Sequence, residues 1–206
     1  DIFNAINEQF DDAIIVTDVG QHQMLTSQYV DITENRQIIM SGGLGTMGYG
    51  LPGAIGAKIG NPDKPVIAIS GDGGMQMNIQ ELQFIVREKL PIKIVVFNNN
   101  ALGMIRHFQE MYFNGNYYQT KPSGGYDAPN FSQIAAAYGI RSICWNLDNL
   151  PLDPVLEFYD DLPLLVEIRI KEDTYIFPKL KFGKPNQDQE PLLDRELYNR
   201  LMKLGS

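Results

Sequence analysis

Apolar runs rich in β-branched residues, separated by longer helical patterns, constrain the fold of this chain more than any other feature of its sequence. The four main runs are AIIVTDV, VIAIS, IKIVVF and LLVEIRI, at residues 13–19, 66–70, 92–97 and 164–170, and shorter ones occur at 37–40 and 141–145. Three of the main runs are almost continuously apolar, which is typical of strands covered on both faces. Helical patterns lie between them at 51–59, 79–89, 102–111 and 131–138. This alternation predicts an α/β fold with a doubly wound, mostly parallel sheet and helices on both faces.

The chain is large enough for one ordinary globular core, because 44% of its 206 residues are hydrophobic. From Phe177 onward the alternation stops, and one short helical pattern remains near residues 192–204. We therefore expect one domain over residues 1–176 and an extended tail over residues 177–206. The chain begins without Met in a helical pattern, which indicates a piece of a longer polypeptide. The pattern Asn78-x-x-Glu81 predicts a capping box at the start of the helix at 79–89.

The charge of the chain limits its partners. Its net charge is −8 and it has no basic stripe, which argues against a nucleic-acid-binding surface. An anionic ligand must then be held by backbone amides, helix N-termini or a metal. Cys144 is the one cysteine, which is compatible with a reducing cytosol, so we expect a cytoplasmic protein. No apolar run reaches the roughly 18 residues of a membrane span, and the first ten residues do not form a signal peptide.

A glycine-rich stretch, SGGLGTMGYGLPGAIGA at residues 41–57, contains the spacing of a dinucleotide-binding fingerprint, Gly43-x-Gly45-x-x-Gly48. Asp72 lies 24 positions after Gly48 (72 − 48), close to where a ribose-binding acid belongs. Pro52 argues against this function, because it indicates a helix that begins near Leu51 and not at the glycines. Asp72 is also flanked by glycines, which indicates a turn. A nucleotide site and a loop that merely packs closely on the sheet are the alternatives.

Polar residues follow two of the predicted strands. Asp72 and Asn99 lie 27 positions apart (99 − 72), each after an apolar run, with one helical pattern between them. Because successive parallel strands lie close together, both side chains are expected at the carboxyl edge of the sheet, where α/β folds bind ligands. A carboxylate and an amide oxygen suit Mg²⁺ that also binds water and substrate phosphates, which Gly73 and Gly74 let backbone amides approach. A turn aspartate and a polar loop at 98–100 are the alternative interpretation.

The motif Gly71-Asp72-Gly73 followed by Asn98-Asn99 resembles the signature of thiamine-diphosphate enzymes, GDG followed about two dozen residues later by NN. In order along the chain, VGQHQM at 19–24, the glycine-rich stretch, GDGGMQMNIQEL and NNNALGMIRHFQE resemble the C-terminal cofactor domain of acetolactate synthase large subunits. The resemblance covers roughly residues 12–170. It implies the thiamine-diphosphate-binding fold and an enzyme of branched-chain amino-acid biosynthesis, which converts two pyruvates to 2-acetolactate and CO₂.

The resemblance also implies a role for individual residues. Mg²⁺ would be bound by the side chains of Asp72 and Asn99 and by the backbone carbonyl of Ala101. Met47 would be an apolar wedge that bends the cofactor, beside the Gly45 carbonyl. The residues implied to contact the cofactor are Gly20, Gln21, His22, Gly45, Met47, Gly71, Asp72, Gly73, Gly74, Asn99, Gly103 and Met104.

Some parts of such an enzyme are expected outside these residues. In the family, the glutamate that activates the aminopyrimidine lies on the N-terminal pyrimidine domain of a partner subunit, and a middle domain helps to bind FAD. We therefore expect no catalytic side chain in this chain, which would be inactive alone. The parent would carry both further domains, bind thiamine diphosphate, Mg²⁺ and in some members FAD, and form a homodimer or homotetramer.

Two features depart from acetolactate synthases. Phe108 stands where they usually have Trp, in the pocket for the acceptor substrate. KFGKPNQDQEPLL at 181–193 resembles homologues from bacterial surface-polysaccharide pathways. The alternatives are therefore a carboligase with a sugar or aldehyde acceptor, a simple decarboxylase, and a non-catalytic α/β module that binds phosphate or a nucleotide.

Overall fold

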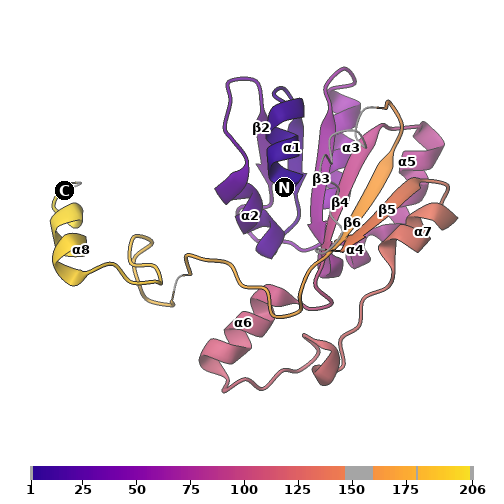
Figure 1. Cartoon of the computed structure of the whole chain (residues 1–206). Helices are drawn as coiled ribbons and strands as arrows, with labels where there is room; N and C mark the ends of the chain where they lie inside the picture. Colours follow the sequence, from indigo (N-terminus) through magenta and orange to yellow (C-terminus); the bar gives the residue numbers. More distant parts are fainter. Residues whose placement is uncertain (1, 147–159, 180, 205–206) are drawn as a thin grey trace. The chain divides into compact units, whose positions relative to one another are not determined.

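A computed structural model describes residues 2–146, 160–179 and 181–204 of the chain. Two compact units are formed, Asp1–Thr174 and Tyr175–Ser206. The first unit is built on a six-stranded sheet in which every neighbouring pair of strands is parallel, in the order β2-β1-β3-β4-β6-β5 (Figure 1). The prediction of a doubly wound parallel α/β sheet is confirmed.

The strands coincide closely with the six apolar runs. They are β1 (Ile14–Thr17), β2 (Gln37–Met40), β3 (Val66–Gly71), β4 (Ile92–Asn98), β5 (Arg141–Asn146) and β6 (Leu164–Arg169). The helices of this unit are α1 (Ile2–Gln9), α2 (Gln21–Tyr29), α3 (Gly50–Gly60), α4 (Asp72–Met77), α5 (Leu82–Glu88), α6 (Gly103–Tyr112) and α7 (Phe131–Ala137), with short 3₁₀ helices η1 (Ile79–Glu81) and η2 (Pro122–Gly124). The helix that contains Pro52 begins at Gly50, as its position predicts.

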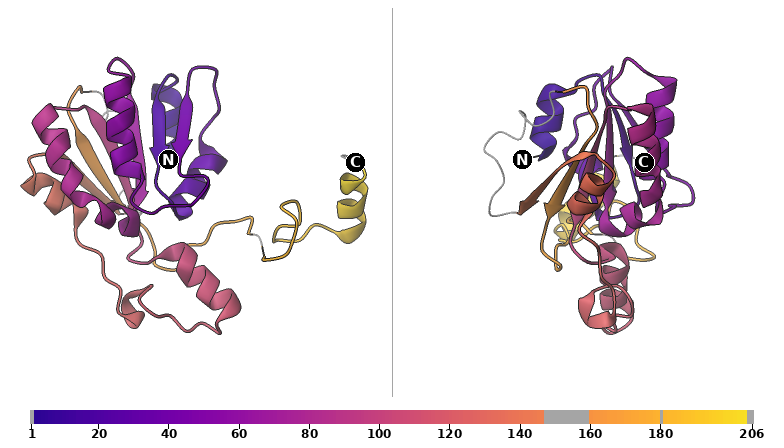
Figure 2. Two further views of the ribbon diagram at one scale, coloured as in Figure 1. Left: turned by 180° about the vertical axis from the view of Figure 1, so that it is seen from behind. Right: turned by 90° about the vertical axis from the view of Figure 1, so that its right-hand side faces the viewer.

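Helices cover both faces of the sheet, as Figure 2 shows. Successive residues of a strand point to opposite faces, so β1 contributes Ile14 and Val16 to one core and Ile15 to the other. The first core includes residues of α3, α5 and α7, and the second includes residues of α1. This two-sided burial is the reason that the central strands are apolar at nearly every position.

The buried Arg36 fixes α1 against the start of β2. Its guanidinium donates hydrogen bonds to the backbone carbonyls of Ile6, Asn7 and Phe10 at the end of α1, at 2.9–3.3 Å, and to that of Asp31 at 2.6 Å. One side chain thus supplies donors to the carbonyl groups at the C-terminus of the helix, where intrahelical partners run out.

The topology positions a crevice at the carboxyl edge of the sheet. From β1 the chain crosses to β2 on one side and then to β3 on the other, so the connections after β1 and β3 diverge. Such a switch point is where open α/β sheets bind ligands. β3 and β4 are direct neighbours, and Gly71 pairs in register with Phe97, so Asp72 and Asn99 leave the sheet at the same edge.

Two local predictions were wrong, and one helix was missed. Asp72 does not lie in a turn but is the first residue of α4. The predicted helix at 79–89 is divided into η1 and α5, and Asn78 forms no side-chain cap on η1, because its Nδ2 donates to the Gly48 carbonyl at 2.7 Å. Helix α2, which begins directly after Gly20, was not predicted.

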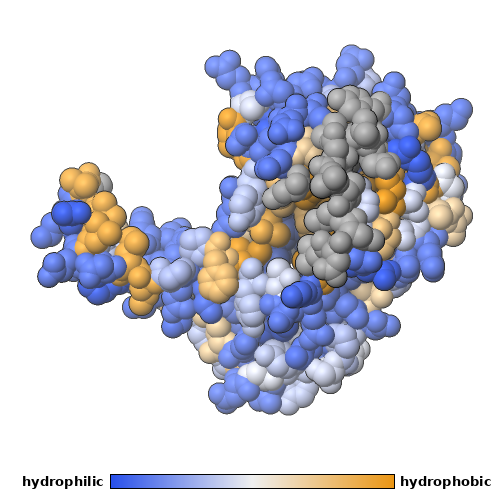
Figure 3. All heavy atoms as spheres, in the orientation of Figure 1, coloured by the Kyte–Doolittle hydropathy of each residue, from blue (hydrophilic) through white to orange (hydrophobic). Residues whose placement is uncertain are grey.

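The second unit contains α8 (Arg195–Met202), which confirms the helical pattern near residues 192–204. Asp194 caps this helix, because its Oδ1 accepts from the backbone N–H groups of Glu196 and Leu197, both at 3.0 Å. Apolar side chains gather on the surface of α8, as Figure 3 shows. Among the described residues, no helix combines the length and apolarity that crossing a membrane requires.

Candidate functional site

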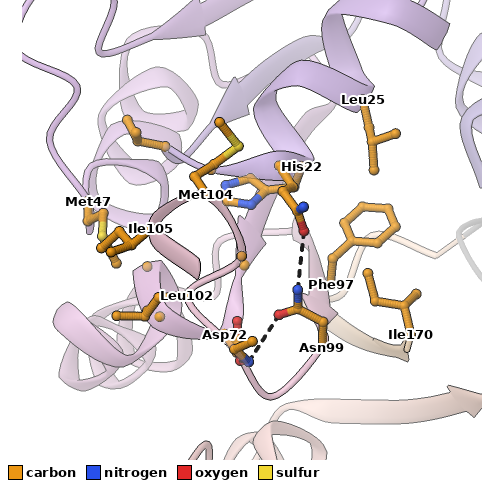
Figure 4. A pocket seen from close by; sticks show the side chains of 18 residues that line it. His22, Leu25, Met47, Asp72, Phe97, Asn99, Leu102, Met104, Ile105 and Ile170 are labelled. Carbon is orange, nitrogen blue, oxygen red and sulfur yellow. Dashed lines mark hydrogen bonds between the residues drawn. The ribbon is translucent and has the colours of Figure 1, made fainter. Parts of the chain in front are cut away.

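A pocket lies at the carboxyl edge of the sheet, between the segments that follow β1, β3 and β4 (Figure 4). Its lining residues are Val19, Gly20, Gln21, His22, Leu25, Met47, Gly71, Asp72, Gly73, Gly74, Phe97, Asn99, Ala101, Leu102, Gly103, Met104, Ile105 and Ile170. Every residue implied to contact the cofactor or the metal is therefore in this lining, with the exception of Gly45.

Two predicted residues lie outside the pocket lining. Gly45 is in the exposed loop between β2 and α3, with a φ of 62°, two positions from the lining residue Met47. Phe108 is on α6, 37% exposed, and its ring lies 4.8 Å from that of Tyr112 and 5.9 Å from that of Phe113, between centroids.

The predicted metal ligands converge on one backbone group. The N–H of Ala101 donates to Asp72 Oδ2 at 3.0 Å and to Asn99 Oδ1 at 3.2 Å. Both side chains are buried, with exposed fractions of 3% and 6%. Burial raises the pKa of Asp72 to about 6, opposed by hydrogen bonds from the Gly73 backbone, the Tyr126 hydroxyl and the Ala101 N–H. Burial and the neighbouring Asp72 carboxylate in turn raise the pKa of Tyr126 above its ordinary value.

His22 lies at the start of α2 and is also buried. Its Nε2 has no hydrogen-bond partner within the described part of the chain. Burial lowers the pKa of His22 to about 4, with an opposing hydrogen bond to the Asp18 backbone, so the ring is neutral near pH 7. A Cβ at Gly20 would lie 2.6 Å from the ring's Cε1, and one at Gly71 would lie 2.9 Å from Nδ1. These two glycines leave room for the imidazole.

Gln21 connects Asn99, a predicted metal ligand, to the end of the first unit. Its Oε1 accepts from Asn99 Nδ2 at 3.2 Å, and its Nε2 donates to the Thr174 carbonyl at 2.8 Å. Arg106 of α6 donates to the same carbonyl at 2.9 Å. A Cβ at Gly103 would collide with Gln21 Oε1 and lie 3.0 Å from Asn99 Nδ2, so a glycine is needed at this point.

Asp18 is a site residue that sequence reasoning missed. Its carboxylate is 1% exposed and accepts from the backbone N–H groups of Val19, Gly48 and Gly50 at 2.7, 3.0 and 2.9 Å. A Cβ at Gly74 would lie 2.6 Å from its Oδ1. Asp18 thus ties the glycine-rich stretch to the end of β1, and Gly74 leaves room for its carboxylate beside the start of α4. The signal in the sequence was one aspartate at the end of an apolar strand, directly before VGQH.

Apolar side chains form the walls of the pocket, as Figure 4 shows. Met47, Leu102 and Ile105 lie on one side, and Leu25, Phe97 and Ile170 on the other. Of these six, Met47 alone was identified from the sequence. The motif Gly103-Met104 was the available signal for its neighbours Leu102 and Ile105, whereas Leu25, Phe97 and Ile170 resemble ordinary core residues in the sequence.

The donor set fits a magnesium ion that is shared with a phosphorylated ligand. Asp72, Asn99 and Ala101 offer one carboxylate, one amide oxygen and one backbone carbonyl, which are all hard oxygen donors. Among the described residues, no group of three or more His, Cys, Asp or Glu is arranged to hold a metal ion. A divalent cation at Asp72 would therefore need further oxygen ligands from phosphate and water, which is the coordination that Mg²⁺ prefers. The buried Nε2 of His22 offers a polar contact beside it.

Comparison with known proteins agrees with this geometry. Residues 18–157 match the family model described as thiamine pyrophosphate enzyme, C-terminal TPP binding domain. The acetolactate synthase large subunit of Lactococcus lactis subsp. lactis (strain IL1403) is 43% identical over 173 residues, which are 84% of this chain and 29% of that protein. The isozyme 1 large subunit of acetolactate synthase from Escherichia coli (strain K12) is 39% identical over 189 residues, 91% of this chain and 33% of that protein.

A solved structure has the same fold. Rhodococcus jostii RHA1 thiamine diphosphate-dependent 4-hydroxybenzoylformate decarboxylase matches with a TM-score of 0.71 and 26% identity, over 84% of this chain and 32% of that one. The chain thus spans about a third of the length of these proteins. Because the family model covers most of the chain and includes the segments that follow β1, β3 and β4, the chain belongs to the thiamine pyrophosphate enzymes and contains their C-terminal TPP-binding domain.

Proposed function

We propose that this chain is the cofactor-binding part of a longer acetolactate synthase, and that it holds thiamine diphosphate through a magnesium ion. The observation that carries the proposal is the convergence of Asp72 and Asn99 on the N–H of Ala101, at the switch point of the sheet. The relatives named acetolactate synthase, at 39–43% identity, support the assignment of the reaction.

Mg²⁺ would be bound by Asp72, Asn99 and the carbonyl of Ala101. The diphosphate would lie against Gly20, Gln21 and His22, where an imidazole with a proton on its buried Nε2 would donate to a phosphate oxygen. Gly73 and Gly74 at the start of α4 would add backbone N–H groups, which favour anions at a helix N-terminus. These contacts need no lysine or arginine, which agrees with the net charge of −8.

The protein's own contribution to the reaction would be a dry and rigid pocket. Thiamine diphosphate, when bound, supplies the electron sink for decarboxylation of a 2-keto acid. Met47, Leu102 and Ile105 would exclude water from one side of the bound cofactor, which strengthens electrostatic interactions inside the pocket. Asp18 would hold the loop that carries Met47 through the N–H groups of Gly48 and Gly50. The glycine-rich stretch would therefore serve loop packing and the cofactor, and not a dinucleotide.

A second candidate function keeps the cofactor and changes the substrate. The sequence carries Phe108 in place of the usual Trp, and its tail resembles homologues of surface-polysaccharide pathways. Both features favour a carboligase with a sugar or aldehyde acceptor. The structural neighbour is a decarboxylase by name, so decarboxylation without carboligation is a further outcome to test.

Further properties of the parent polypeptide stay predictions from the sequence. It would carry a pyrimidine domain and a middle domain, since this chain spans about a third of its relatives. It would be a cytoplasmic homodimer or homotetramer whose sites are shared between subunits. FAD would bind through the middle domain, and the pathway would be branched-chain amino-acid biosynthesis.

The products of the full-length polypeptide test the proposal. It is incubated with thiamine diphosphate, Mg²⁺ and pyruvate, and the products are identified by mass spectrometry. Formation of 2-acetolactate with release of CO₂ is expected. Release of CO₂ without acetolactate, or turnover only after addition of an aldehyde or sugar, would replace the first assignment by the second.

A further inference from the structure

A fully buried carboxylate lies behind the proposed metal site. Glu167 is in β6, between β4 and β5, and has an exposed fraction of 0%. Its neighbours along the strand, Val166 and Ile168, are apolar core residues. Burying a carboxylate in such a place is costly unless hydrogen bonds compensate it, so its partners indicate what it does there.

Three donors surround Glu167. Its Oε1 accepts from Asn98 Nδ2 at 2.8 Å, and its Oε2 accepts from the backbone N–H of Ser132, in the first turn of α7, at 2.9 Å. Arg169, which is partly exposed, donates to Oε1 from Nε at 3.4 Å. A carboxylate suits this place because each of these partners, among the residues that the structure describes, is a donor.

Asn98 connects Glu167 to the turn at residues 98–101, which carries two of the proposed metal ligands. Its Oδ1 accepts from the backbone N–H of Asn100 at 2.9 Å. Asn100 has a φ of 49°, in the left-handed region, and its Oδ1 accepts from the Ala128 N–H at 2.8 Å. Residues 98–100 are therefore held by contacts with Glu167 and Ala128, which are not in the pocket lining. This turn contains Asn99 and Ala101, which are two of the three proposed metal ligands.

We propose that Glu167 is a positioning residue for the metal, which acts through Asn98 on the turn that presents Asn99 and Ala101. The inference rests on the proposed binding of Mg²⁺ and thiamine diphosphate at this edge of the sheet. Partners that hydrogen-bond directly to a metal ligand typically change metal affinity 10- to 100-fold when they are altered, and Glu167 acts one residue further from the metal, so we expect an effect near the lower end of this range.

Glu167→Gln is the sharpest substitution, because it keeps the size of the side chain. An amide has one accepting oxygen, so its NH₂ group must face either the Ser132 N–H or Asn98 Nδ2. If Asn98 rotates to accept from the new amide, its own NH₂ group faces the N–H of Asn100. Each arrangement leaves a donor-to-donor conflict, and the conflict at Asn98 lies directly beside the metal ligands.

The experiment measures how much Mg²⁺ the full-length polypeptide needs to bind thiamine diphosphate. Cofactor binding is followed by titration calorimetry over a series of Mg²⁺ concentrations, and the melting temperature without cofactor is recorded in parallel. Glu167→Gln is expected to raise the Mg²⁺ midpoint about 10-fold, with cofactor binding restored at saturating Mg²⁺. Asn98→Ala, which removes the connection and leaves Glu167 in place, is expected to raise the midpoint in the same direction.

Val166→Ala is the matched control, because it removes buried atoms from the same strand on its other face. It should lower the melting temperature and leave the Mg²⁺ midpoint unchanged. If Asn98→Ala and any folded Glu167→Gln protein behave like this control, the positioning role is wrong and Glu167 is only structural. If the wild type binds no thiamine diphosphate with Mg²⁺, the proposed function fails first and the inference fails with it.

Discussion

Replacing Gly74 by alanine should destabilise the protein, although alanine is the better helix former. Gly74 lies within α4, where helix propensity alone favours alanine by up to about 1 kcal/mol. The added Cβ would lie 2.6 Å from Asp18 Oδ1 and 3.0 Å from Ser70 Oγ. Under about 3 Å one of the groups must move, and Asp18 is held by three backbone N–H groups.

The expected size follows from these contacts. A hydrogen bond to a charged acceptor contributes about 1.5–3 kcal/mol, and displacing the carboxylate weakens one or two of them. Subtracting about 1 kcal/mol for the gain in helix propensity leaves a net loss of roughly 0.5–5 kcal/mol. The upper end of this range is a large part of the roughly 5–15 kcal/mol that stabilises an ordinary domain.

Gly56→Ala is the matched control for this experiment. Gly56 is an exposed residue within α3, and no atom lies within 4 Å of the position that an added Cβ would occupy. This substitution should stabilise the protein by about 0.5–1 kcal/mol. Urea unfolding followed by circular dichroism measures both variants. A Gly74→Ala protein as stable as the wild type would refute this reasoning. Adding Asp18→Ala should make the loss from Gly74→Ala smaller, because the two sites share one contact.

Three further predictions concern pH, the pocket and α1. Because the pKa of His22 falls from 6.5 to about 4 on folding, the unfolded chain binds the proton first as the pH drops. The contribution of the neutral ring to the free energy of unfolding is complete above pH 6.5 and declines by about 3 kcal/mol towards pH 4. Between these pH values the free energy of unfolding of His22→Gln should therefore change less with pH than that of the wild type, which urea unfolding at several pH values measures. Gly103→Ala should weaken thiamine diphosphate binding about tenfold in calorimetry, because its Cβ displaces the Gln21–Asn99 hydrogen bond; unchanged affinity would contradict this. Arg36→Met should lower the free energy of unfolding by roughly 2–4 kcal/mol in urea, because the carbonyls of Asn7, Phe10 and Asp31 each lose a hydrogen bond from a charged donor.

The sequence predicts those parts of this molecule whose signals are local. The strands are long apolar runs, so their period and length identify them, and Asp72 and Asn99 each follow one of these runs. The sheet edge then brings the two residues together by topology alone. The position of the pocket therefore follows from the order of strands and the two polar strand ends.

Features that depend on distant contacts were missed. The local signal for Asp18 is an aspartate at a strand end, which does not identify its partners Gly48 and Gly50 in a loop about 30 residues later. The capping pattern failed because Asn78 instead bonds to Gly48 across the fold. Helix α4 begins with DGG, a sequence of poor helix propensity, and its glycines are required by packing against neighbouring side chains. Tertiary contacts override the local preference at each of these places.

The central claim is that Asp72, Asn99 and Ala101 hold the metal through which thiamine diphosphate binds. The most direct measurement is calorimetric titration of the full-length polypeptide with thiamine diphosphate, with Mg²⁺ and with a chelator, for the wild type and Asp72→Ala. We expect the wild type to bind thiamine diphosphate with Mg²⁺ but not with the chelator. Asp72→Ala should lose at least about 100-fold in affinity for thiamine diphosphate in the presence of Mg²⁺. Equal binding by the two proteins, or tight binding in the chelator, would contradict the account.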